Sequence, residues 1–159
     1  MHAWAMRARG QAGGRATPPE KIHLTLAFLG DVPQPDVDRV VAAARRVRGA
    51  ACTLLIGEAR FWPHNRIVWA GPRETPAALV TLAEELRIKL GKEGFPLERR
   101  PFAAHITVLR KARDARALPP LPTLEWPVTE FHLVRSMLGP DGSTYETVAR
   151  FALDAGQEA

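Results

Sequence analysis

The sequence of 159 residues contains a single cysteine, Cys52. One cysteine excludes an internal disulfide and a zinc site built from cysteines, and it fits a reducing, cytoplasmic location. No apolar run approaches the ~18 residues that span a bilayer, and the first residues lack the basic and apolar regions of a signal peptide. Hydrophobic residues make up 46% and charged residues 25% of the chain, which is typical of a globular protein without membrane contact.

Acidic residues are scarce where basic residues are dense. The formal net charge is +5, and the isoelectric point is about 10.1. Residues 99–116 contain six basic residues and one acid. Such a patch favours an anionic partner such as a phosphate, although charge alone is equally compatible with a solvated loop.

Hydrophobic periodicity predicts helices at two places. The first is expected over 36–48, and the second begins at Thr75 as N-cap and continues to Lys92. The apolar stripe of the second helix recurs every three or four residues: Leu79, Leu82, Ala83, Leu86 and Leu90. Residues 1–21 resemble the frayed end of a helix that runs into a loop.

Apolar runs bounded by turn residues predict strands between these helices. We expect a hairpin that turns at 139–142 and a proline-rich connector before it, at 118–127. The predicted strands cover residues 22–29, 51–59, 66–70, 103–109, 128–138 and 145–153. Helices mixed with turn-linked strand pairs indicate an α+β fold with antiparallel sheet.

Two of these strands carry the same short pattern. Residues 22–26 read Ile-His-Leu-Thr-Leu, and residues 104–108 read Ala-His-Ile-Thr-Val. Because alternate side chains of a strand share a face, His23 and Thr25 are predicted to point one way, as are His105 and Thr107. One such triplet alone is best interpreted as a half-buried strand. Two such triplets, both in apolar strands, favour a functional site that uses both histidines.

A pair of histidines suits displacement at phosphorus. A base is needed at the attacking oxygen and an acid at the leaving oxygen, and histidine does both near neutral pH. Threonine hydroxyls can donate to non-bridging phosphate oxygens. Since these groups cover both the proton transfers and the charge, the pattern requires no metal or other cofactor. A module that binds RNA phosphates without catalysis stays open as an alternative.

The paired His-x-Thr-x motifs resemble the two-histidine phosphoesterases, and among them the RNA 2′,3′-cyclic phosphodiesterases, also called the 2′-5′ RNA ligase family. A first motif block at 17–30 contains Thr-Pro-Pro-Glu-Lys-Ile-His-Leu-Thr-Leu-Ala-Phe-Leu-Gly. A second block at 99–111 contains Arg-Pro-Phe-Ala-Ala-His-Ile-Thr-Val-Leu-Arg. The resemblance covers about residues 15 to 154.

The resemblance implies one bilobal domain over 1–159, with two pseudo-symmetric antiparallel sheets, outer helices and a central cleft. Separate halves of the molecule would each supply one histidine. The implied reaction is metal-independent hydrolysis of RNA 2′,3′-cyclic phosphate ends, or of small cyclic-phosphate nucleotides, to 2′-phosphomonoesters. ATP-independent 2′-5′ ligation of RNA is implied as a side or reverse activity. A phosphodiesterase for 2′-5′ oligonucleotides or small cyclic nucleotides is the alternative within the superfamily, and no obligate protein partner is indicated.

By the same resemblance, His23 is the proton donor and His105 the proton acceptor. Thr25, Thr107 and Arg110 would bind the substrate phosphate. Strict alternation points Arg110 away from the other motif residues, unless the strand ends near Leu109.

Family members usually carry an apolar strand before the first motif. Here 22 residues precede His23 and none is predicted as that strand, so the N-terminus is expected to be shortened. Phe28 is predicted to lie in the core. Phe61 and Trp62 are expected near a loop, where packing is favoured over stacking on a base, and His64 and His132 are expected at the surface.

Overall fold

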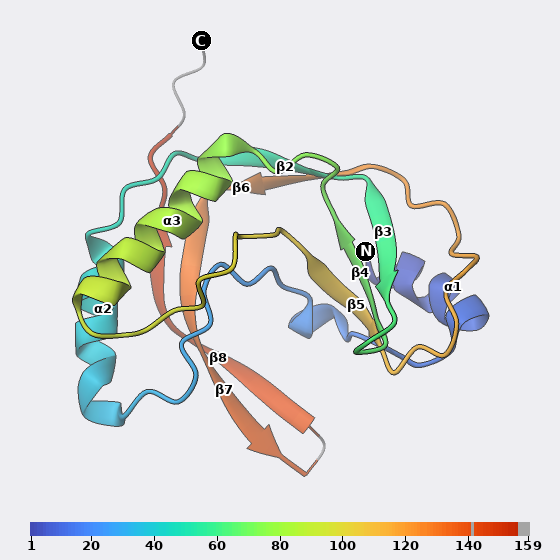
Figure 1. The fold of residues 1–159 in the computed structure, drawn as a ribbon, viewed down its shortest axis with the longest axis horizontal. Helices are drawn as coiled ribbons and strands as arrows, with labels where there is room; N and C mark the ends of the chain where they lie inside the picture. The colour runs from blue at the N-terminus through green and yellow to red at the C-terminus, as the bar shows by residue number, and fades with distance from the viewer. Residues whose placement is uncertain (141, 156–159) are drawn as a thin grey trace. The chain divides into compact units, whose positions relative to one another are not determined.

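The computed structural model describes residues 1–140 and 142–155 (Figure 1). The chain divides into two compact units. Unit 1 comprises Met1–Thr25, Leu54–Glu74 and Ala104–Trp126, and unit 2 comprises Leu26–Thr53, Thr75–Ala103 and Pro127–Ala159. Each unit contains helix and antiparallel strand pairs. The predicted α+β fold with antiparallel sheet is therefore confirmed.

Unit 1 contains a four-stranded sheet in the order β1-β5-β4-β3. Its strands are β1 (Arg15–Ala16), β3 (Glu58–Trp62), β4 (Ile67–Gly71) and β5 (Ile106–Arg110), and each neighbouring pair is antiparallel. One face of the sheet is apolar. Four side chains on it are at most 1% exposed: Val68, Ala70, Ile106 and Leu109.

Helix α1 (His2–Ala12) contacts β1 and β5. Its small residues recur at helical spacing, and Ala5, Ala8 and Ala12 are at most 1% exposed. The indole Nε1 of Trp4 donates to the carbonyls of Pro119 and Pro120, at 3.1 and 3.0 Å. The expectation of a frayed N-terminal segment is therefore wrong, because alanines let the helix approach the sheet closely. A short strand, β1, also precedes the first motif.

Strand β2 (Cys52–Ile56) pairs with β6 (Leu124–Val128). The strand predicted over 51–59 is thus two strands, β2 and β3, which are separated at Gly57. The proline-rich connector predicted over 118–127 ends in β6. Burial raises the pKa of the Cys52 thiol, which lowers the thiolate fraction at neutral pH and with it the thiol's reactivity.

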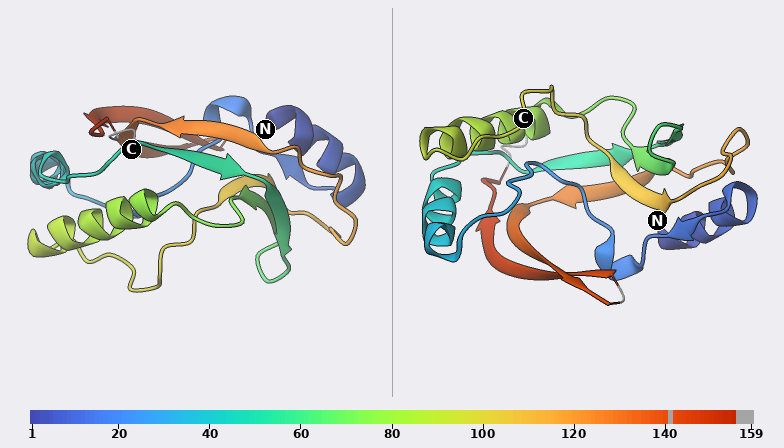
Figure 2. Two further views of the ribbon diagram at one scale, coloured as in Figure 1. Left: turned by 90° about the horizontal axis from the view of Figure 1, so that it is seen from above. Right: turned by 60° about the horizontal axis from the view of Figure 1, so that its bottom comes forward.

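Unit 2 contains the short 3₁₀ helix η2 (Gln34–Asp36), helix α2 (Val37–Arg45), helix α3 (Ala77–Lys92), and the hairpin of β7 (Glu130–Gly139) and β8 (Gly142–Ala152). Figure 2 shows the curvature of the hairpin. Both helices and the hairpin confirm the sequence predictions, although Asp141 of the predicted turn lies outside the described residues. Within the described chain, none of the helices is long and apolar enough to cross a bilayer.

The apolar stripe of α3 is buried as predicted, with its five members between 1% and 6% exposed. Each leucine contributes about 1.5–3 kcal/mol by burial. The helix begins one residue later than expected, with Pro76 and not Thr75 at the N-cap. Helix α2 packs against α3.

The strand predicted over 22–29 is wrong. Within this range only Leu24 forms a β-bridge, with Ile106 of β5, and the next segment, Leu26–Thr53, belongs to unit 2. Without a strand partner after Leu24, the segment continues as irregular chain that follows the 3₁₀ helix η1 (Pro19–Lys21). Phe28, expected in the core, is 80% exposed.

Gly14 provides a test of how closely the N-terminal segment approaches β5. Its φ is +83°, and an added Cβ would lie 2.5 Å from the carbonyl oxygen of Arg110. We expect Gly14→Ala to lower the free energy of unfolding by about 2 kcal/mol or more, through backbone strain and steric overlap. In the matched control Gly10→Ala, nothing lies within 4 Å of the new Cβ, so helix propensity should raise stability by about 0.5–1 kcal/mol. Urea denaturation of the two variants would reveal opposite signs, and equal effects would contradict the described approach.

Candidate active site

The two His-x-Thr motifs meet at one backbone bridge in unit 1. Leu24 and Ile106 are antiparallel bridge partners, and Ile106 is 1% exposed. Partners in such a bridge point to the same face, and the flanking residues point to the other. The bridge register therefore places His23 opposite Thr107 and Thr25 opposite His105. In a regular antiparallel pair such diagonal neighbours lie about 7–8 Å apart, a separation at which two imidazoles can reach one phosphoryl group.

Burial follows the predicted alternation. His105 and Thr107 are half-buried, whereas Ile106 and Val108 are buried, and His23 and Thr25 are both exposed. Both motifs lie in unit 1. We expected separate halves of the molecule each to supply one histidine. This is wrong, because the segment before Thr25 bridges to β5 and both histidines belong to unit 1.

The backbone sets the orientation of His23. Its Nδ1 lies 2.7 Å from the carbonyl oxygen of Lys21. Because a carbonyl only accepts, Nδ1 carries a hydrogen in this contact, and Nε2 is the ring atom that can give or take a proton. The carbonyl of Lys21 is fixed in turn by η1, in which Lys21 N donates to Pro18 O at 2.9 Å.

His105 packs within an aromatic cluster that consists of Trp62, Trp69 and His105 itself. Its ring centroid lies 4.9 Å from that of Trp62, with an interplanar angle of 65°. The centroid of Trp69 lies 6.5 Å from His105 and 5.3 Å from Trp62. These edge-on contacts restrict the imidazole ring. Trp62 lies at the end of β3 and was expected near a loop.

Trp69 was not anticipated from the sequence. It lies opposite Thr107 in the β4–β5 register, and a sequence pattern does not reveal which strands pair. Its buried indole Nε1 has no hydrogen-bond partner among the described residues. Next to it, Gly71 lets β4 approach closely, because a Cβ there would lie 2.7 Å from Ala104 O.

Strand β5 is held from its other side by Thr17. The Thr17 hydroxyl donates to Thr107 O at 2.9 Å, and Thr17 N donates to Val108 O, also at 2.9 Å. The backbone that follows the Thr107 side chain is therefore held by two hydrogen bonds.

A β-bulge changes the direction of Arg110. Trp69 pairs with Thr107, but its neighbour Val68 pairs with Leu109, so Val108 is an extra residue on β5. Consecutive residues of β4 point to opposite faces, and bridge partners share a face. Leu109 therefore lies on the apolar face, and Arg110 lies on the face of Thr107. The alternation that pointed Arg110 away from the motif residues is broken at Val108.

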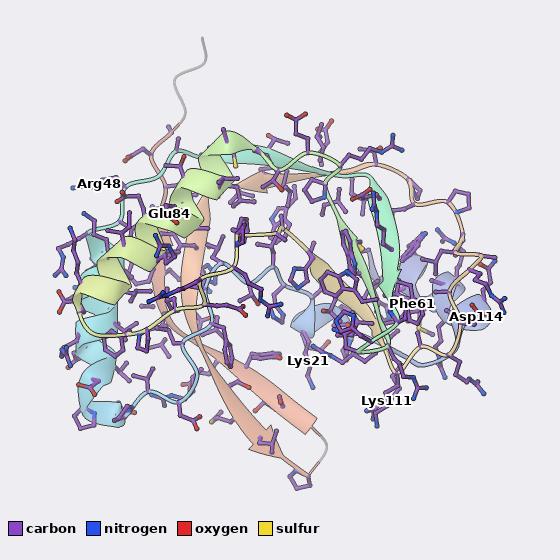
Figure 3. All side chains as sticks on the ribbon, viewed as in Figure 1. Lys21, Arg48, Phe61, Glu84, Lys111 and Asp114 are labelled. Carbon is purple, nitrogen blue, oxygen red and sulfur yellow. The ribbon has the colours of Figure 1, made fainter. Side chains whose placement is uncertain are left out.

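His64, His132 and Lys111 lie outside the two motifs. His64 is exposed, 6.2 Å from the Trp62 ring, and His132 of β7 is exposed with its Nε2 2.8 Å from a Glu130 carboxylate oxygen. Both confirm the expected surface positions. Lys111, labelled in Figure 3 at the end of β5, is exposed. In the part of the chain that the structure describes, no group of three or more His, Cys, Asp or Glu residues is arranged to hold a metal ion.

The aromatic cluster can be tested by circular dichroism. Trp62 and Trp69 are close enough for exciton coupling between their indoles. We expect Trp62→Phe and Trp69→Phe each to abolish the coupled band, whereas Trp126→Phe, at a residue that is 38% exposed, should retain it. A coupled band that persists in Trp62→Phe would contradict the described packing around His105.

The chain is similar to a family of phosphoesterases over nearly its whole length. Residues 1–69 and 70–145 match the family described as LigT like Phosphoesterase. The RNA 2′,3′-cyclic phosphodiesterase of Escherichia coli K12 is 38% identical over 142 residues, which are 88% of this chain and 80% of that protein. The Thermus thermophilus protein of the same name is 35% identical over 158 residues, with 92% of this chain and 79% of that protein covered.

Solved structures agree with this relationship. E. coli LigT in its apo form matches with a TM-score of 0.86 at 34% identity, covering 96% of this chain and 90% of that chain. E. coli LigT complexed with 3′-AMP matches with a TM-score of 0.84 at 33% identity, covering 96% and 92%. The fold, the paired motifs and these matches together show that the chain belongs to the LigT-like phosphoesterase family.

Proposed function

We propose that this protein hydrolyses RNA ends that carry a 2′,3′-cyclic phosphate and produces 2′-phosphomonoesters without a metal ion. The observation that carries the proposal is the bridge between Leu24 and Ile106. The residues that flank such bridge partners point to the opposite face, and here these are the histidines and threonines of the two motifs. Family membership supports the phosphoesterase chemistry, and the relatives named RNA 2′,3′-cyclic phosphodiesterase support this substrate.

In the proposed reaction, His105 accepts a proton from water as the water oxygen bonds to phosphorus. The bond from phosphorus to the 3′ oxygen breaks, and His23 gives a proton to that oxygen. The products are a 2′-phosphomonoester and a free 3′ hydroxyl. If the 5′ hydroxyl of a second RNA replaces water as the nucleophile, its oxygen bonds to phosphorus and gives its proton to His105. The bond to the 3′ oxygen breaks, His23 protonates that oxygen, and a 2′-5′ phosphodiester results.

The surroundings of each histidine suit its proposed role. Nδ1 of His23 donates to Lys21 O, so Nε2 is the ring nitrogen proposed to deliver the proton, and the exposed position lets a bulky leaving strand approach. His105 is half-buried against Trp62, which fixes the direction of a base that must align one water molecule. The division of roles follows the family resemblance.

Thr25, Thr107 and Arg110 are proposed to bind the phosphate. Each hydroxyl lies opposite a histidine in the bridge register, where it can donate to a non-bridging oxygen as negative charge develops. Arg110 shares their face through the bulge at Val108, and its guanidinium can hold a phosphate through two hydrogen bonds.

The decisive experiment follows the product of one defined substrate. An oligoribonucleotide that ends in a 2′,3′-cyclic phosphate is incubated with the protein in the presence of EDTA, and the product is identified by phosphorus NMR. We expect a 2′-phosphate at a rate that EDTA leaves unchanged. A 3′-phosphate product, or activity that needs a divalent ion, would contradict the mechanism. If this substrate does not react but a 2′-5′ oligonucleotide assayed in parallel is cleaved, the alternative substrate is supported.

The histidines can be tested by substitution. We expect His23→Ala and His105→Ala each to lower kcat by ~10²–10⁴-fold, because each removes a proton-transfer group, with little change in the affinity for the 2′-phosphate product. His132→Ala, which removes an exposed histidine of unit 2 that belongs to neither motif, is the matched control and should retain full turnover. If the protein only bound RNA, the two motif variants would weaken affinity and no turnover would exist to lose.

A further inference from the structure

A second phosphate-binding position is indicated beside Arg110. In the β1–β5 register, Arg15 lies directly opposite Arg110. Both residues are exposed. Like charges directly opposite each other on neighbouring strands destabilise a sheet, so the pair is unfavourable unless an anion lies between or beside the two guanidinium groups.

The described residues do not neutralise this pair. Among the described residues, no carboxylate forms an ion pair with Arg15 or Arg110, whereas several other arginines have acidic partners. Asp114 is the acid in the basic stretch 99–116, and it already binds Arg116, with Nε 2.9 Å from Oδ2. Arg116 holds the pKa of that carboxyl below its usual value, so Asp114 stays charged and paired with Arg116.

The arginine pair lies on the same face as the candidate site. Bridge partners share a face, so Arg15 points with Arg110, and the bulge at Val108 turns Arg110 to the face of Thr107. Arg110 follows Thr107 by three residues, which is about 10 Å at the rise of a strand. Long arginine side chains can cover that distance, so the pair borders the place where the terminal phosphate would bind.

We propose that Arg15 binds the phosphodiester that precedes the cyclic end of an RNA, next to the terminal phosphate held by Arg110 and the two threonines. This inference rests on the proposed function and narrows its substrate class. A mononucleoside cyclic phosphate has no preceding phosphodiester, whereas an oligonucleotide does. The enzyme should therefore prefer oligonucleotides, whatever their sequence, because the contact is to the backbone.

The test compares two substrates, cytidine 2′,3′-cyclic phosphate and the dinucleotide CpC that ends in a 2′,3′-cyclic phosphate. We expect wild type to have the higher kcat/KM on the dinucleotide and Arg15→Gln to reduce the ratio of the two values about tenfold, as for a lost charge-assisted hydrogen bond. The slope of log kcat/KM for the dinucleotide against log salt should become shallower by about 0.7, the value for one phosphate contact on a single strand.

Two further variants separate a specific contact from general effects. Arg15→Lys keeps the positive charge and should retain most of the salt dependence. Arg7→Gln removes the same charge from an exposed position on α1 and should leave the substrate ratio at the wild-type value. If Arg7→Gln lowers the ratio as much as Arg15→Gln does, the effect is net charge and the proposal is wrong. Thermal unfolding of each variant shows whether the fold is intact.

A binding measurement keeps this inference separate from the proposed reaction. The affinities for CpC with a terminal 2′-phosphate and for cytidine 2′-phosphate are measured by calorimetry. Arg15→Gln should lower the ratio of these affinities about tenfold. If wild type hydrolyses neither cyclic substrate, the proposed function fails, and the binding ratio still decides the role of Arg15. If wild type is active and Arg15→Gln changes neither ratio, only the second phosphate position is refuted.

Discussion

The geometry of the candidate site depends on the backbone pairing of β5. This strand has the Leu24 bridge and β1 on one side and β4 on the other. Glycines allow close approach at both ends: a Cβ at Gly14 would meet Arg110 O at 2.5 Å, and one at Gly71 would meet Ala104 O at 2.7 Å. The positions of the histidines are thus set by main-chain contacts on both flanks, and side-chain packing then fixes the rings.

The bulge at Val108 allows two neighbouring apolar residues of β5 to be buried while the charged residue after them stays exposed. Val108 and Leu109 are both fully buried, and a regular strand could bury only one of two neighbours on the same face. The extra residue lets both enter the interior and returns Arg110 to the face of Thr107. The burial of the apolar pair and the direction of Arg110 therefore depend on the same bulge.

Features that depend on the periodicity of the sequence were predicted correctly. The predictions failed for features that depend on which distant segments pair. The α3 stripe, the β7–β8 hairpin and the opposite facing of His105 and Ile106 each follow from spacing alone. Residues 22–29 have a strand-like pattern, but a strand needs a neighbour, and only Leu24 has one. The exposure of Phe28, the contact of Trp62 with His105 and the direction of Arg110 likewise depend on pairings that no local pattern encodes.

The two histidines differ in how firmly the fold supports them. His105 immediately precedes β5, which is paired along its length, and its ring packs on Trp62 at 4.9 Å. His23 lies in an irregular segment that the Leu24 bridge joins to the sheet, and its Nδ1 donates to Lys21 O. Segments with few buried contacts open at a lower free energy than core strands. Local opening around Leu24 would thus separate the imidazoles while the sheet stays folded, so the arrangement of the site is less stable than the unit that carries it.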